Sequence, residues 1–313
     1  MRTLIIGAAG FVGGYLIDHL LKTSHGALNV TKMPHETLSN ASVEICDLNL
    51  LDMEAVKNLI DRLRPEHIYH LAAQSSVALS WKNPGLTVDV NIKGTLNLLD
   101  AIRSIDNYRP RILLIGSGEE YGYIHPEETP VNEDTLLRPG NIYAATKACQ
   151  NMLGTIYTKA YNMDIVMVRA FNHIGPNQTP IFVTADFCKQ VAEIEAGKKE
   201  PVLSVGNLEA MRDFTDVRDV VRAYALLLEK GQSGETYNIG SGKAVRIRQI
   251  LDMILSYSKI SIQVRQDPER LRPSDIPIIE ADIRKVHETT GWEPEIPLEQ
   301  TIVETLNYWR NQI

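Results

Sequence analysis

Three residues of this chain have the types and the order of an acid–base site. Tyr143 and Lys147 stand four residues apart in N-I-Y-A-A-T-K, so on a helix they share one face. An ammonium group beside a phenol favours the tyrosinate, which lowers the pKa of the tyrosine and makes it an acid–base group near neutral pH. Ser117, upstream in I-G-S-G-E-E-Y-G, adds a hydroxyl. We therefore predict a proton donor at Tyr143, with Ser117 beside the reacting oxygen.

A glycine-rich turn near the N-terminus indicates a bound ligand that could react beside the acid–base group. Gly7, Gly10 and Gly13 follow the apolar run T-L-I-I and open a helical pattern. In such a turn the first glycine allows the sharp bend, the second admits a pyrophosphate, and the third lets helix and strand pack closely. The helix N-terminus adds free N–H groups and positive potential. We expect a dinucleotide here, and the alternative is a purely structural turn.

The second strand indicates which nicotinamide cofactor is bound. An acidic residue at its carboxyl end would bind the ribose 2′-hydroxyl and repel a 2′-phosphate. The run A-L-N-V ends instead in Thr31 and Lys32, and no acidic residue follows before Glu36. This favours NADP(H), with NAD(H) as the alternative. Asp47, after the third strand, is either an acceptor for the adenine amino group or an ordinary turn aspartate.

The first half of the chain alternates short apolar runs with amphipathic helical patterns. This alternation predicts a parallel, doubly wound α/β sheet whose carboxyl-end loops lie beside the ligand. The expected strands are Thr3–Ile6, Leu28–Val30, Val43–Cys46, His67–Leu71, Arg111–Ile115 and Asp164–Arg169. The expected helices are Phe11–Lys22, Ala55–Arg64, Gly85–Ser104 and Tyr143–Tyr161.

After Asn172 the pattern changes, with loop signals at Gly175-Pro176 and Thr179-Pro180. We expect a cofactor-binding domain over residues 1–171 and a smaller α/β substrate domain over 172–313, from which later segments return to the first. The elements expected there are helices at Val183–Ala196, Val217–Leu228 and Ile247–Ser256, strands near Val202–Val205, Tyr237–Ile239 and Ser261–Val264, and two final helices.

The composition limits the partners and the environment. The chain has 313 residues, of which 44% are apolar, enough for a large α/β unit and a smaller domain. Its net charge of −7 argues against a general nucleic-acid binder. Cys46, Cys149 and Cys188 have neither disulfide-framework nor metal-ligand spacing, and no stretch resembles a membrane span. Met1 leads directly into the first strand without a signal sequence, so we expect a cytoplasmic protein.

Further motifs make the chain resemble a known family. With the glycine turn, the serine and Y-x-x-x-K, the segments H-L-A-A at His70–Ala73 and N-I-K-G-T at Asn91–Thr95 resemble the extended short-chain dehydrogenase/reductases, essentially from end to end. The resemblance implies a Rossmann domain that binds NAD(P) and a small nucleotide-sugar domain, with 4-epimerase, 4,6-dehydratase or 4-keto reductase chemistry. The cofactor contacts expected with it are Gly7, Gly10, Phe11, Val12, Gly13, Lys32, Asp47, Leu48, Leu71, Ala72, Ala73, Tyr143, Lys147 and Ala170.

The second half resembles the GDP-mannose branch of that family. The segments that carry this likeness are Gly206–Phe214, Val245-Arg246, Arg272–Asp275 and Gly291–Pro294. The resemblance implies that Arg212, Arg246 and Arg272 bind the GDP diphosphate, a task that suits guanidinium forks. Taken singly, each arginine is as readily a solvated surface residue. The other substrate contacts expected are Asp275, on a ribose hydroxyl, together with Val183, Asn207 and the more loosely matched Asn172 and Lys189.

Two activities of that branch fit the site. Reduction of the C4 ketone of GDP-4-dehydro-6-deoxy-D-mannose to GDP-D-rhamnose needs Tyr143 as proton donor. Dehydration of GDP-mannose also needs a base for the C5 proton, and Glu119, two residues after Ser117, stands where the dehydratase pattern has it. Gly118 stands where some dehydratases carry an acid. The whole-chain likeness favours the reductase; a dehydratase or another 4-epimerase is the alternative, and a non-catalytic NADP(H)-sensing regulator is a remote third.

The helical patterns at 85–104 and 143–161 carry more apolar residues than one buried face requires. Packing against the sheet explains them in one interpretation. In the other, which the resemblance implies, two copies form a homodimer through a four-helix bundle.

Overall fold

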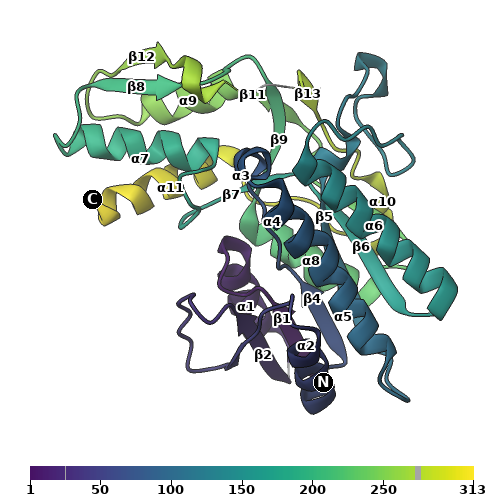
Figure 1. Ribbon diagram of the computed structural model, residues 1–313. Coiled ribbons are helices and arrows are strands. Elements are labelled where there is room, and N and C mark those ends of the chain that lie inside the picture. Colours follow the sequence, from purple (N-terminus) through teal and green to yellow (C-terminus); the bar gives the residue numbers. More distant parts are fainter. Residues whose placement is uncertain (25, 272–275) are drawn as a thin grey trace.

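The computed structural model describes residues 1–24, 26–271 and 276–313. Its centre is a seven-stranded parallel sheet with the strand order β10-β6-β5-β4-β1-β2-β3 (Figure 1). The strands are β1 (Arg2–Ile6), β2 (Ala27–Lys32), β3 (Glu44–Asp47), β4 (His67–His70), β5 (Arg111–Ser117), β6 (Asp164–Ala170) and β10 (Thr236–Ile239). The predicted α/β class and the doubly wound parallel sheet are confirmed.

Helices cover both faces of this sheet. One face carries α1 (Phe11–Thr23), α8 (Val217–Lys230) and α10 (Arg284–Thr290), and the other carries α2 (Met53–Leu63), α5 (Gly94–Arg103) and α6 (Ile142–Tyr161). Leu16 and Tyr224 belong to the buried cluster of the first layer, and Val56 and Leu98 to that of the second. Because both faces are covered, the strands are continuous apolar runs rather than alternating ones.

A smaller unit, at the upper left of Figure 1, is built around β9 (Met211–Asp216). Its other elements are β7 (Asn172–Ile174), β8 (Val202–Val205), β11 (Ala244–Arg246), β12 (Gln263–Gln266), β13 (Ile278–Ile279), α7 (Val183–Glu195), α9 (Ile247–Ser256) and α11 (Leu298–Gln312). β9 pairs with β7, β11 and β13, whereas β8 pairs with β12. The three helices bury a core of their own that includes Phe187, Ile250 and Leu306.

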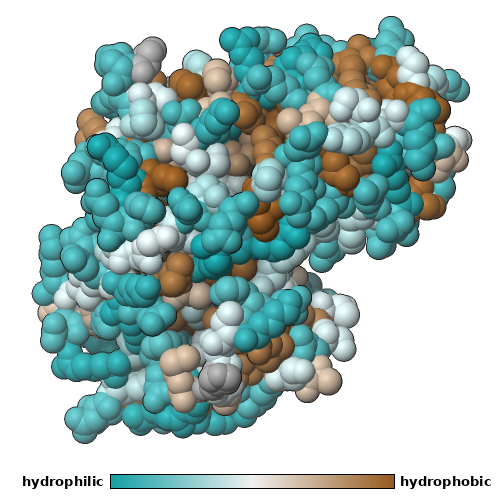
Figure 2. All heavy atoms as spheres, turned by 180° about the vertical axis from the view of Figure 1, so that it is seen from behind, coloured by the Kyte–Doolittle hydropathy of each residue, from teal (hydrophilic) through white to brown (hydrophobic). Residues whose placement is uncertain are grey.

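The chain passes between the two units several times. It enters the smaller unit after β6, returns with α8 and β10, leaves again at β11, and comes back with α10 before α11. Seen from behind, the surface is hollowed between the smaller unit at the upper right and the large-sheet unit below it (Figure 2). Of the helices in the described residues, none is both long and apolar enough to cross a membrane.

The helix expected over 85–104 is present, with a π-helical turn in its middle. The structure has α4 (Pro84–Val88), a π-helical turn (Asp89–Lys93) and then α5. Asn91 is fully buried in the π turn, where its side chain accepts from the Gln74 N–H at 2.8 Å and donates to Thr146 Oγ1 at 2.9 Å. These bonds tie the turn to the loop after β4 and to α6, and π turns of this kind often occur at functional sites.

Short elements were the least predictable ones. Sequence reasoning missed β7, β9, β11, β13 and the helix α3 (Val77–Lys82). It also placed the strand at Ser261–Val264 too early, because pairing with β8 begins only at Gln263, opposite Val202.

Gly13 gives a test of the packing between α1 and the preceding turn. A Cβ at this position would stand 2.1 Å from the carbonyl oxygen of Ala8. Gly13→Ala is therefore expected to lower the free energy of unfolding by about 2 kcal/mol or more. Gly14→Ala is the matched control, because no described atom outside the helix backbone lies within 4 Å of its Cβ, and it should stabilise the helix by about 0.5–1 kcal/mol. Urea denaturation compares them, and equal stabilities would contradict this packing.

Candidate active site

Ser117 is the last residue of β5 and is buried at the carboxyl edge of the large sheet. The chain then forms a short 3₁₀ helix, Gly118–Tyr121, whose start is fixed by a capping box. Ser117 Oγ accepts a hydrogen bond from the Glu119 N–H at 3.2 Å, and the Ser117 N–H donates to Oε1 of Glu120 at 2.8 Å. The serine is thus held through its backbone and its side chain, while its own hydroxyl proton can be donated to another oxygen.

Tyr143 and Lys147 lie in the first turns of α6, and both are buried, with 8% and 3% of their surface exposed. The Lys147 Nζ donates to the carbonyl oxygen of Ile115 in β5 at 2.6 Å and to Oε1 of Gln150 at 3.0 Å. The Tyr143 hydroxyl has Ser117 as a hydrogen-bond partner. The structure therefore brings the serine, the tyrosine and the lysine together at one edge of the sheet.

The environment does not lower the tyrosine pKa, so this part of the sequence prediction is wrong. Burial raises the pKa of Tyr143 well above its usual value; the hydrogen bond with Ser117 opposes this, and the charges of Glu119 and Glu120 add to it. The reason is the direction of the Lys147 ammonium, which faces β5 and a glutamine rather than the phenol. Burial also lowers the pKa of Lys147 to about 8, against the opposing effect of Glu120. At neutral pH the tyrosine holds its proton and can donate it.

The glycine turn has the geometry of a phosphate-binding loop. Gly7 has a φ of +83°, and a Cβ there would stand 2.6 Å from the backbone of Ala72. The Ala8 N–H donates to the carbonyl oxygen of Thr31 at 2.8 Å, which ties the turn to β2. α1 begins after Gly10, which has no side chain to cap the first turn. The first N–H groups of α1 are therefore offered to an anion such as a pyrophosphate.

Lys32 and Asp47, to which the sequence gave separate tasks, form one ion pair of 2.6 Å. They are register partners at the carboxyl ends of β2 and β3. The Lys32 side chain is 15% exposed and that of Asp47 is 56% exposed. The Lys32 ammonium lies where a cation would favour a cofactor with a 2′-phosphate. Asp47 neutralises part of the positive charge of Lys32.

The other residues expected at the cofactor surround the same turn. The N–H groups of Leu71 and Ala72 both donate to the carbonyl oxygen of Ile6, at 3.0 and 2.9 Å, so the H-L-A-A segment lies against the end of β1. The remaining residues expected at the cofactor lie at the ends of helices and strands or just beyond them. Phe11 and Val12 begin α1, Leu48 follows β3, Ala73 lies in the loop after β4, and Ala170 ends β6. Their contacts to a cofactor stay predictions.

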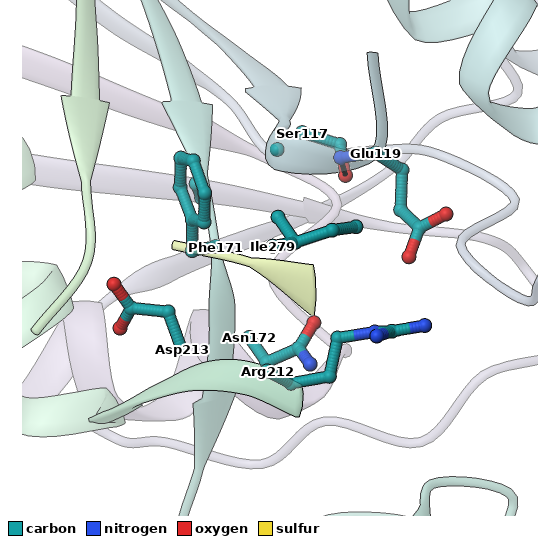
Figure 3. Close-up of a pocket in the computed structure, with 9 residues that line it drawn as sticks. Ser117, Glu119, Phe171, Asn172, Arg212, Asp213 and Ile279 are labelled. Atoms are coloured by element: carbon teal, nitrogen blue, oxygen red, sulfur yellow. Dashed lines mark hydrogen bonds between the residues drawn. The ribbon is translucent and has the colours of Figure 1, made fainter. Parts of the chain in front are cut away.

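A pocket lies at the carboxyl edge of the sheet, where the two units meet (Figure 3). It is lined by Ser117, Gly118, Glu119, Ala170, Phe171, Asn172, Arg212, Asp213 and Ile279. Figure 3 shows Ser117 and Glu119 on one side of this space and Asn172 and Arg212 on the other. Glu119 Oε2 accepts from Asn141 Nδ2 at 3.2 Å, and Asn141 is the N-cap of α6. The pocket thus gathers a hydroxyl, a carboxylate, an amide and a guanidinium.

The expected substrate residues are brought together only in part. Arg212 and Asn172 line the pocket; Arg212 is 8% exposed, and its Nη1 donates to the carbonyl oxygen of Ile276 at 2.7 Å. Arg246, on the neighbouring strand β11, is exposed and pairs with Glu209 at 3.2 Å. Val183 begins α7, and Asn207 follows β8. Arg272 and Asp275 lie outside the described residues.

Lys189, another expected substrate residue, does not line the pocket, and its contact with a substrate stays a prediction. Its ammonium pairs with Glu193 one helical turn away, at 3.6 Å, and lies 5.7 Å from the centre of the Trp309 ring in α11. The side chain therefore serves the packing of α7 on α11. The loose match to a family position gave no information on which face of α7 the residue occupies.

Sequence reasoning missed a buried ion pair behind the pocket. Glu120 is fully buried, and its Oε2 accepts from Nε of Arg169 at 3.0 Å. Arg169 itself was a signal, because a charged residue inside the apolar run of a buried strand needs a partner. The sequence does not show that Glu120 is this partner. It stands directly after Glu119, and the sequence alone does not tell which of the two glutamates is buried and which lines the pocket.

The sheet, the glycine turn and the group of Ser117, Tyr143 and Lys147 together define an NAD(P)-dependent enzyme of the extended short-chain dehydrogenase/reductase class. In the part of the chain that the structure describes, no three His, Cys, Asp or Glu side chains gather in a way that would hold a metal ion.

The chain belongs to the GDP-mannose 4,6-dehydratase family, whose model matches residues 4–305. It is 31% identical to GDP-6-deoxy-D-mannose reductase of Pseudomonas aeruginosa, over 100% of this chain and 98% of that one. It is 30% identical to GDP-mannose 4,6-dehydratase of Yersinia enterocolitica, over 97% of this chain and 92% of that one.

Two solved structures show the same fold over the whole chain. RMD from Pseudomonas aeruginosa, complexed with NADPH, has a TM-score of 0.88 and 30% sequence identity, and the match covers 100% of this chain and 99% of that one. UDP-glucose 4-epimerase from Thermus thermophilus, in complex with NAD, has a TM-score of 0.89 at 28% identity and 100% coverage of both chains. These similarities establish a nucleotide-sugar enzyme, and its reaction has to be argued from the site.

The titration of Lys147 tests the electrostatics of this site. Because its pKa is lowered to about 8, it should lose its proton well below the exposed lysines, whose usual value is about 10.4. Carbon NMR of protein labelled at the lysine ε-carbon follows this titration, and the variant Lys147→Met identifies the resonance. A midpoint above about 10 would show that burial does not shift the group.

Proposed function

We propose that this protein is an NADPH-dependent 4-keto reductase that converts GDP-4-dehydro-6-deoxy-D-mannose to GDP-D-rhamnose. The observation that carries the proposal is the buried, protonated Tyr143, hydrogen-bonded to Ser117, which lines the pocket. Reduction of a ketone begins with a proton donor, whereas a dehydratase or an epimerase first oxidises the sugar and needs the tyrosine as a base. The raised pKa of Tyr143 favours the first task.

The residues around the glycine turn fit NADPH. The uncapped start of α1 suits the pyrophosphate, and the Lys32 ammonium at the end of β2 suits a 2′-phosphate. Because Lys32 is shared with Asp47, NAD(H) is the alternative cofactor. Bound NADPH supplies the hydride that C4 of the sugar takes up.

The chain's own residues hold the ketone and move the proton. Ser117 donates a hydrogen bond to the C4 oxygen and fixes the carbonyl beside Tyr143. Tyr143 gives its phenolic proton to that oxygen as negative charge develops on it, so that the carbonyl becomes a hydroxyl. Solvent then restores the proton of the tyrosinate left behind, while the Lys147 ammonium, held by Ile115 and Gln150, adds positive charge to this edge of the sheet.

One arginine of the pocket supports a substrate with a diphosphate. Arg212 lies across the pocket from Ser117 (Figure 3), and a guanidinium group there can pair with phosphate oxygens. Arg246 follows Val245, the register partner of Arg212 on β11, so a regular strand directs it to the other face, and its part in phosphate binding rests on the family likeness alone. The choice of GDP over other nucleotides rests on the likeness to the GDP-mannose branch.

A GDP-mannose 4,6-dehydratase is the second candidate, and Glu119 favours it. The Glu119 carboxylate lines the pocket, where it can act as the base for a C5 proton. The position before it is occupied by Gly118, where a Cβ would already stand 3.0 Å from the Phe171 ring. An additional acid at that position would have to displace the ring.

NADPH absorbance separates the two candidates. With GDP-4-dehydro-6-deoxy-D-mannose as substrate, the purified protein is expected to oxidise NADPH in proportion to the sugar consumed. A protein that leaves NADPH unchanged, but converts GDP-mannose to the keto sugar without added cofactor, is the dehydratase, and Glu119 is then its base.

Tyr143→Phe tests the proton donor. Loss of the phenolic proton should lower kcat by about 10²–10⁴-fold with little change in the affinity for the GDP-sugar. Stopped-flow kinetics and calorimetry of substrate binding measure the two effects. Tyr161→Phe, on the exposed end of the same helix, is the matched control and should retain activity. Near-full activity of Tyr143→Phe would remove it from the mechanism.

We also propose that two copies associate through α4 and α6. Leu86 and Val88 on α4 are 39% and 42% exposed, and Met152 and Ile156 on α6 are 55% and 53% exposed. α4 lies against α6, so both helices offer exposed apolar side chains, of the kind that a partner covers.

Light scattering tests this association. The protein should have twice the mass of its 35.1 kDa chain, and the double variant Met152→Glu/Ile156→Glu should have that of one chain. Leu136→Glu, at a 65% exposed apolar residue in the loop before α6, is the control and should leave the mass unchanged. A wild-type protein with the mass of a single chain would contradict the dimer.

A further inference from the structure

A carboxylate that the mechanism does not use lies directly behind Ser117. Glu120 is fully buried. Its Oε1 accepts the Ser117 N–H at 2.8 Å, and its Oε2 accepts from Arg169 Nε at 3.0 Å and from Asn151 Nδ2 at 3.2 Å. The three donors come from β5, β6 and α6, so this one side chain joins the elements that carry the active site.

The fold leaves a defined space for this carboxylate. A Cβ on Gly116 would stand 2.2 Å from Glu120 Oε1, so a larger residue in β5 would displace it. Arg169 is held in turn, since its Nη1 donates to the Tyr121 hydroxyl and to the carbonyl oxygen of Glu133, both at 3.0 Å. The Glu120 carboxylate is therefore held in one position, because both it and its partner Arg169 are fixed by further hydrogen bonds.

Lys147 and Glu120 bond to the same end of β5, the lysine to the carbonyl oxygen of Ile115 and the glutamate to the N–H of Ser117, so the carboxylate lies near the buried ammonium. Burial raises the pKa of Glu120, whereas Arg169, the Ser117 N–H and Lys147 lower it and favour the charged form. The other titratable groups around the lysine do not supply such a charge. His70, at the end of β4, is neutral, because burial and the nearby Lys147 lower its pKa to about 3. Tyr143, on α6, keeps its proton, and Arg169, on β6, is a cation already paired with the glutamate.

We propose that Glu120 is a positioning residue: its carboxylate fixes the backbone N–H of Ser117 and places a negative charge near the Lys147 ammonium. Its effect on turnover rests on the proposed reductase function, whereas its effect on Lys147 does not. The two tasks have different requirements, since the first needs an acceptor oxygen at the right distance and the second needs a charge.

Two variants separate the tasks. Glu120→Gln keeps the length and an acceptor oxygen but removes the charge, so the titration midpoint of Lys147 should fall by about one pH unit or more, a tenfold loss of proton affinity. Glu120→Asp keeps the charge but shortens the reach to Ser117, so the midpoint should stay near the wild-type value while kcat falls. Lysine ε-carbon NMR measures the midpoints.

Kinetics give a second readout. For Glu120→Gln, kcat for NADPH oxidation at about pH 8 should fall about fivefold or more, with KM for the GDP-sugar unchanged, because Glu120 does not line the pocket. A general loss of structure would instead raise KM and lower kcat together, to the same degree in Glu120→Gln and Glu120→Asp, and would overturn the proposal.

Glu120→Gln leaves Arg169 buried without its partner, so its folding has to be checked by circular dichroism. The double variant Glu120→Gln/Arg169→Met removes both charges together and should fold. It should also show the lowered Lys147 midpoint. A midpoint equal to wild type in this variant would overturn the assignment of the charge to Glu120. If wild-type protein oxidises no NADPH, the proposed function has failed. The Lys147 titrations still test whether Glu120 supplies the negative charge.

Discussion

The Lys147 ammonium has to remain charged at a place that water hardly reaches. The residue is 3% exposed, and burial lowers its pKa to about 8. The carbonyl oxygen of Ile115 and the side-chain oxygen of Gln150 replace its water at 2.6 and 3.0 Å, and Glu120 supplies a negative charge. These groups come from β5, α6 and the turn between them, so the charge depends on the packing of α6 on the sheet.

The same packing decides what Tyr143 can do. Burial keeps its phenol protonated, and Ser117 at the end of β5 connects it to the pocket. The other wall of the pocket is built by β7 and β9, which the chain reaches only after leaving the large sheet at β6. The proton donor is thus part of a rigid sheet edge, while Arg212 and Asn172 belong to the smaller unit that closes over it.

Much of this arrangement can be read from the sequence, because it depends on local patterns. The alternation of apolar runs and amphipathic segments predicted the sheet, and the order of glycine turn, serine and Y-x-x-x-K predicted the site. The direction of a side chain cannot be read in this way. The contact of Lys147 with Ile115, the pairing of Lys32 with Asp47 and the burial of Glu120 all depend on how distant segments meet.

Deuterium transfer tests most directly whether this site performs a net reduction at C4. The protein would be given GDP-4-dehydro-6-deoxy-D-mannose and NADPH with deuterium in the transferable position, and the product sugar would be examined by NMR. A reductase places the deuterium on C4 in an amount equal to the cofactor oxidised. A product without deuterium at C4, or unconsumed cofactor together with unchanged keto sugar, would contradict the account of Tyr143 as the proton donor of a reduction.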